Sequence, residues 1–157
     1  MSAVYFMMAF GAGMAVTLQT TLNGQLSKGI GGDSVAAALF SFVIGMLFLA
    51  VVASARGGIV ASLGAIPAQP LWCLMGGLLG ACALLCNVVL VPRIGLAALL
   101  GLVIAGQLIS SLVIDHFALL GVNARPVSVI KFSGATLMLL GLAISLFGDR
   151  WSRMIFR

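Results

Sequence analysis

The sequence predicts an all-α polytopic membrane protein with five transmembrane helices, the size of one half of an inverted-repeat transporter. Five apolar stretches of about twenty residues carry almost no charge, and a helix of that length crosses a hydrocarbon core of roughly 30 Å. Hydrophobic residues make up 62% of the 157 residues and charged residues only 7%, whereas a soluble domain carries about 25% charged residues. An odd number of spans places the two termini on opposite sides of the membrane. Two copies can therefore form a two-fold pore of the inverted-repeat kind only if one copy is inverted.

The predicted spans cover residues 4–26, 35–55, 71–91, 96–114 and 127–147, and together form a single membrane domain of residues 1–157. The first span starts almost at Met1, has no basic stretch before it and is too long for a signal-peptide core. We therefore expect it to be retained as a helix. It ends at a turn-rich segment in which Asp33 or Ser34 can cap the second helix by accepting from its free N–H groups.

The remaining connections are short, which leaves no room for a soluble domain. Residues 58–70 form the longest connection, which is mildly apolar and suits a short surface helix. Trp72 stands where an interfacial aromatic residue is expected. Pro92 to Gly95 predicts a tight turn after the third span, and residues 115–126 predict a loop before the fifth.

The basic residues give a weak preference for one orientation. With alternating spans, one membrane face carries Lys28, Arg93, Arg150, Arg153 and Arg157, and the other carries Arg56, Arg125 and Lys131. The positive-inside rule then places the C-terminus in the cytoplasm. Without the three tail arginines the preference reverses, so a dual orientation stays open. The formal net charge of +5 is explained by topology and does not indicate a nucleic-acid partner.

Few polar side chains lie inside the spans, and these are the candidate substrate-binding residues. Gln19 and Asn23 are about 40° apart on one face of the first span, and Gln107 and Ser111 share a face of the fourth. Amides in hydrocarbon need partners, either in the protein or in a water-filled cavity. These residues could line a substrate cavity near mid-membrane or could join helices by hydrogen bonds. For Asn87, in the third span, the second interpretation is favoured.

Asp115 directly follows the fourth span, and acids in membranes are functional candidates. It could act as a coupling or gate residue. Alternatively, it could lie at the interface beside His116 and meet lipid headgroups, Arg125 or Lys131. No carboxylate lies at mid-membrane, which argues against an antiporter with a central carboxylate.

Other residue patterns indicate packing rather than chemistry. Gly76 and Gly80 have the small-xxx-small spacing that lets membrane helices approach closely. Cys73, Cys82 and Cys86 form no CxxC pair and are best interpreted as buried small hydrophobic residues. With one histidine and three acids, the sequence predicts no metal site, no cofactor and no enzyme activity.

Several motifs occur in an order that is similar to a known family. They are Gln19-xxx-Asn23, Ala38-Leu39-Phe40-Ser41-Phe42, Trp72-xxx-Gly76, Pro92-xx-Gly95 and Gly106-Gln107-xxx-Ser111-xxx-Asp115-His116-Phe117. Together they resemble the YdcZ-type family, five-span bacterial proteins of the drug/metabolite transporter superfamily, over nearly the whole chain. The resemblance implies an exporter in the bacterial inner membrane, with members that occur as oppositely oriented pairs, fused doubles or dual-topology single chains. One departure is Ala118, where the family pattern has glycine and the turn could be altered.

The expected function is therefore export of a small molecule by an antiparallel dimer in the lipid bilayer. The second subunit could be another copy or a different five-span chain of opposite orientation. A dual-topology ion channel and a non-transporting membrane subunit are the alternatives.

Overall fold

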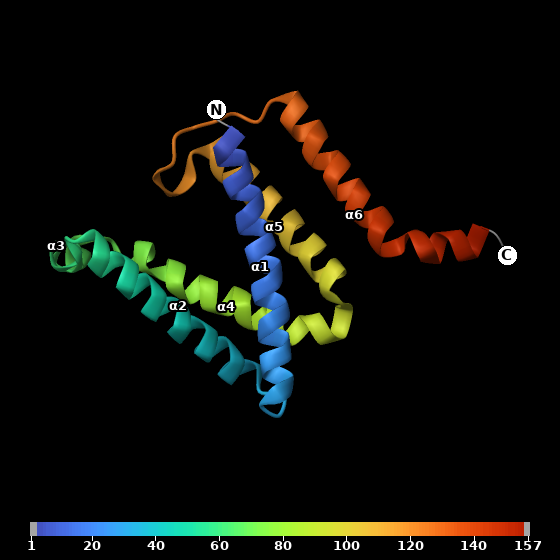
Figure 1. Ribbon diagram of the computed structural model, residues 1–157. Helices are drawn as coiled ribbons and strands as arrows, with labels where there is room; N and C mark the ends of the chain where they lie inside the picture. The colour runs from blue at the N-terminus through green and yellow to red at the C-terminus, as the bar shows by residue number, and fades with distance from the viewer. Residues whose placement is uncertain (1–2, 156–157) are drawn as a thin grey trace. The chain divides into compact units, whose positions relative to one another are not determined.

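The computed structural model describes the backbone of residues 3–155 and the side chains of residues 3–148. Residues 3–155 contain no strand, and five helices are long and apolar enough to cross a membrane (Figure 1). They are α1 (Ala3–Gly29), α2 (Ser34–Arg56), α4 (Leu71–Ile94), α5 (Leu96–Phe117) and α6 (Val129–Ile155). The predicted all-α fold with five transmembrane helices is confirmed. In the basic tail, Arg157 and the side chains of Arg150 and Arg153 lie outside the described part of the chain.

The chain divides into two compact units, Met1–Arg93 and Ile94–Arg157. The first contains α1, α2 and α4 and the short helices α3 (Ile59–Ala65) and η1 (Ile66–Ala68), and the second contains α5, η2 (Leu119–Gly121) and α6. The short helices α3 and η1 occupy the segment in which a surface helix was expected. A single domain over residues 1–157 stays a prediction.

In the first unit, one face of α1 buries three polar side chains, whereas apolar side chains elsewhere on the helix are exposed. Thr20, Asn23 and Ser27 are only 1%, 5% and 6% exposed, whereas Leu18 and Leu22 are 61% and 67% exposed. The three buried residues recur every three or four positions and therefore lie on one face of the helix. This distribution suits a membrane protein, because the exposed leucines match lipid and the polar groups are removed from it.

Asp33 caps α2, as predicted. Its Oδ1 accepts hydrogen bonds from the backbone N–H groups of Val35 and Ala36, at 3.0 and 2.9 Å. Two turn residues before it, Gly31 and Gly32, have left-handed φ angles of 83° and 88°, which glycine adopts without steric cost. The chain can therefore reverse between α1 and α2 within a few residues.

A buried apolar cluster and a contact at Gly80 join α2 and α4. Ala38 forms a buried cluster with Leu84 and Val88 of α4. A methyl group at Gly80 would lie 3.9 Å from the Phe42 ring, whereas no heavy atom of the described chain lies within 4 Å of the equivalent position at Gly76. Gly80 therefore has a neighbour in α2, and a packing role for Gly76 stays a prediction.

In the second unit, α5 packs against α6, and the connecting loop is bonded to the end of α5. A methyl group at Gly101 would collide with the Leu142 side chain of α6. The Arg125 N–H donates to the Asp115 carbonyl at 2.8 Å, and the Val127 N–H donates to His116 Nδ1 at 3.3 Å. These bonds hold the loop after α5 close to the final turn of the helix.

Several helix ends differ from the predicted spans by a few residues. The third span was expected to end before Pro92, but α4 continues through it to Ile94. Proline lacks the N–H that would bond to the carbonyl four residues earlier, and its ring crowds that carbonyl, so α4 ends within two residues of Pro92. The turn comes at Gly95, whose φ is 83°. Similarly, α6 begins at Val129, after Ser128, whose hydroxyl accepts from the Lys131 N–H at 3.3 Å.

Candidate functional site

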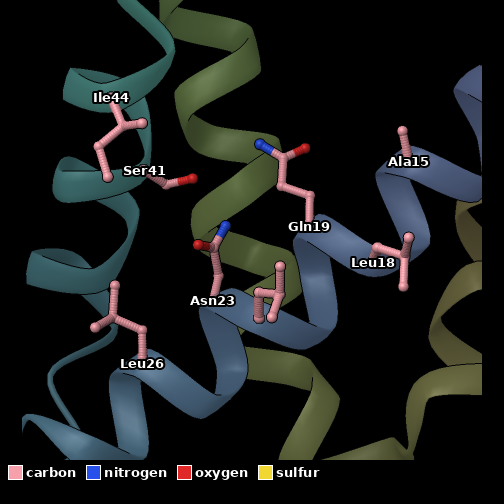
Figure 2. Close-up of a pocket in the computed structure, with 8 residues that line it drawn as sticks. Ala15, Leu18, Gln19, Asn23, Leu26, Ser41 and Ile44 are labelled. Carbon is pink, nitrogen blue, oxygen red and sulfur yellow. The ribbon is translucent and has the colours of Figure 1, made fainter.

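A pocket of about 540 Å³ lies between α1 and α2 in the first unit. This volume is within the range of small-molecule sites, roughly 300–1,000 Å³. The lining residues are Ala15, Leu18, Gln19, Leu22, Asn23, Leu26, Ser41 and Ile44. Figure 2 shows the polar ends of Gln19, Asn23 and Ser41 extending into the space between the two helices. The structure thus brings two predicted site residues, Gln19 and Asn23, to one pocket.

Asn23 is the most unusual residue of this pocket. Its side chain is 5% exposed, and its buried Nδ2 has no hydrogen-bond partner in the described chain. A buried donor without a partner destabilises a fold by about 1–3 kcal/mol, and such groups are rare. Within the described residues, Nδ2 is the only buried side-chain nitrogen or oxygen atom in this condition.

The serine and threonine hydroxyls of α1 are already hydrogen-bonded. The hydroxyls of Thr17, Thr20 and Thr21 donate to backbone carbonyl oxygens four residues earlier, at 2.9–3.1 Å. The hydroxyl of Ser27 pairs with that of Ser34 at 3.3 Å. Since these groups are already satisfied, the amides of Gln19 and Asn23 are the groups of α1 that can turn to a ligand in the pocket.

Ser41 contributes the polar group on the α2 side and was not among the predicted site residues. It is half-buried, and no hydrogen bond of its hydroxyl occurs within the described side chains. A signal was present in the sequence, because Ser41 is the only hydroxyl residue between Val35 and Ala53. Its relevance depends on facing Gln19 and Asn23 across the pocket, which the sequence alone does not show.

The pocket lining contains no charged side chain. Five of its eight residues are apolar, and the three polar ones are amides or a hydroxyl. An ionic ligand would therefore leave water without gaining an opposite charge, which is costly in a low-dielectric environment. The lining suits neutral hydrogen bonding.

Gln107 and Ser111 belong to α5 in the second unit. Both are exposed, and the Ser111 hydroxyl donates to the Leu108 carbonyl at 2.9 Å. They do not line the apolar 180 Å³ pocket between α5 and α6, which involves another face of α5. That they join Gln19 and Asn23 at one substrate site stays a prediction.

Asp115 is half-buried near the C-terminal end of α5. Within the described side chains, no ion pair joins its carboxylate to Arg125 or Lys131, although its backbone carbonyl bonds to Arg125. Next to it, the His116 ring packs edge-on against Phe117 at a centroid distance of 4.8 Å. The carboxylate is thus free to act as a gate or coupling group, and this role stays a prediction.

The described residues contain no group of three or more His, Cys, Asp or Glu side chains that could hold a metal ion. Cys73, Cys82 and Cys86 are free thiols on α4, and all three are exposed in this chain. The expectation that they are buried is therefore wrong for the single chain.

A comparison with protein families matches residues 4–144 to the family described as "Putative inner membrane exporter, YdcZ". The matched range runs from the start of α1 into α6 and includes every candidate site residue. No curated protein and no solved structure matches the chain.

Proposed function

Because the chain belongs to the YdcZ family of multi-pass inner membrane proteins, we propose that it forms one half of a small-molecule exporter. The substrate binds in the pocket between α1 and α2, where Asn23 donates the central hydrogen bond and Gln19 and Ser41 add further polar contacts. In the assembled exporter, Gln107 and Ser111 of α5 also contact the substrate. Asp115, near the C-terminal end of the same helix, acts as a gate or coupling group.

The unpartnered amide nitrogen of Asn23 is the observation on which this proposal rests. Keeping a buried donor unsatisfied lowers stability, which a purely structural residue would not be expected to do. A substrate that supplies the missing acceptor explains its presence. Functional sites often sacrifice stability in this way.

The test compares the growth medium of cells that express the chain with that of cells expressing Asn23→Leu. Untargeted mass spectrometry should find at least one small molecule that is enriched in the first medium and depleted inside the same cells. Loss of one hydrogen bond to the substrate should weaken its binding about tenfold. Both proteins must be present in the membrane at equal amounts.

The matched control is Asn87→Leu, which removes another intramembrane amide that does not line the pocket. It should leave export unchanged. Asn23→Leu should also be at least as resistant to unfolding in detergent as the original chain, since leucine carries no unsatisfied donor. The proposal would be overturned if cells expressing the original chain and cells expressing Asn23→Leu released the same small molecules in the same amounts. A clear loss of stability in that variant would also overturn it and favour a structural subunit.

A further inference from the structure

We propose that the α1–α2 pocket selects uncharged, largely apolar molecules that carry a hydrogen-bond acceptor. This inference rests on the proposed function and specifies the substrate class of the same site. It combines three properties of the pocket: the unpartnered donor, the uncharged lining and the apolar rim.

The donor sets the polar requirement. Asn23 Nδ2 is buried and lacks an acceptor in the described chain, so a ligand carbonyl, ether or hydroxyl oxygen supplies what is missing. A site built around such a donor rejects an analogue without the acceptor, because binding it leaves the donor unsatisfied. Ser41 lies on the opposite helix and can adjust as donor or acceptor, which makes it a specificity residue for the same ligand group (Figure 2).

The lining and the rim set the remaining requirements. None of the eight lining residues is charged, so transfer of an ion into the pocket has no compensating partner. The rim is formed by Leu18, Leu22 and Ile44, which are 61%, 67% and 66% exposed. Exposed leucine and isoleucine side chains match the bilayer hydrocarbon, so an apolar molecule can pass from lipid into the pocket without crossing a polar surface.

Three probes built on the same pair of phenyl rings separate the requirement for an acceptor from the requirement for zero charge. Benzophenone is neutral and has a carbonyl acceptor, 1,1-diphenylethylene has the same shape without the acceptor, and 4-benzoylbenzoate adds a negative charge. Benzophenone also attaches to nearby C–H groups under ultraviolet light. The purified full-length chain in lipid nanodiscs is irradiated with each benzoyl probe, and peptide mass spectrometry maps the adducts.

Benzophenone should label α1 and α2 residues of the pocket, and 4-benzoylbenzoate should not. As a competitor of isotopically labelled benzophenone, 1,1-diphenylethylene should be about tenfold weaker than unlabelled benzophenone, because one hydrogen bond is lost. Asn23→Leu should reduce labelling by a similar factor and Ser41→Ala should reduce it less, while Asn87→Leu leaves it unchanged.

Equal labelling by the anionic probe, equal competition by the hydrocarbon, or adducts only outside the pocket would overturn the inference. These outcomes are distinct from failure of the proposed function. Selective labelling with no export would overturn the exporter alone. Asn23-dependent export of an ionic molecule would support the exporter and overturn the substrate class.

Discussion

The polar residues of α1 differ in how much of their hydrogen-bonding capacity the helix already uses. A threonine hydroxyl reaches a carbonyl oxygen one turn earlier, as Thr17, Thr20 and Thr21 do, and so meets the membrane with little unsatisfied polarity. An asparagine amide has two donor hydrogens and cannot satisfy them on its own helix in the same way. For this reason Asn23, rather than the similarly buried Thr20, has a hydrogen-bond donor left for a ligand.

Ala118 provides a residue-scale prediction, because it ends α5 with a left-handed φ of 52° and ψ of 39°. This conformation brings the Cβ atom close to the following carbonyl group, whereas glycine adopts it freely. Ala118→Gly should therefore stabilise the chain by about 0.5–1 kcal/mol. The measurement is the midpoint of unfolding in mixed detergent micelles.

The matched control for Ala118 is Ala50→Gly, the same chemical change at an exposed position inside α2. There the backbone is right-handed, and glycine should destabilise the helix by about 1 kcal/mol. A shift of both midpoints in the same direction would show that the left-handed end of α5 is not costly. The glycine expected from family resemblance at position 118 thus has a physical explanation in this turn.

At the scale of elements, the contact between α5 and α6 predicts how the second unit responds to a single methyl group. Gly101→Ala would bring its new Cβ into the Leu142 side chain, which must change rotamer or shift. Overpacking of this kind destabilises a core by about 1–3 kcal/mol, and the flexible leucine end places the effect near the lower limit. The unfolding midpoint in detergent should fall accordingly.

Gly106→Ala is the control on the same helix, since no heavy atom of the described chain lies within 4 Å of its new Cβ. Both substitutions improve helix propensity equally, so their difference isolates the contact with α6. The double change Gly101→Ala with Leu142→Ala should recover part of the loss by making room. If Gly101→Ala were as stable as Gly106→Ala, the close contact would be contradicted.

The helices were predictable from sequence because each apolar run matches the membrane thickness and each connection carries turn residues. The Asp33 cap was predictable for the same local reason, and it is present. Exact helix ends and contacts between helices were harder to predict from the sequence. Continuation of α4 through Pro92 depends on where the final turn ends, and the role of Ser41 depends on which α2 face meets α1. Periodicity located Gln19 and Asn23 on one face but could not show that the Asn23 donor lacks a partner.

At the scale of the whole molecule, two chains of five spans each can form a transporter with inverted-repeat symmetry only if one of them is inverted. The basic residues favour neither orientation strongly, since Lys28 and Arg93 oppose Arg56, Arg125 and Lys131 when the tail is set aside. We therefore predict that both orientations occur and that chains of opposite orientation pair with each other. The same reasoning permits a different five-span chain as the partner.

Charge substitutions can fix each orientation and so test this antiparallel assembly. Changing Arg56, Arg125 and Lys131 to glutamine should fix the C-terminus inside, and changing the basic residues of the other face should fix it outside. A C-terminal reporter that is active on one side only confirms each result. When two differently tagged forms are co-expressed, forms of opposite orientation should co-purify in mild detergent, because they complete the inverted pair. Forms of equal orientation should not, and their equal recovery would exclude the antiparallel dimer.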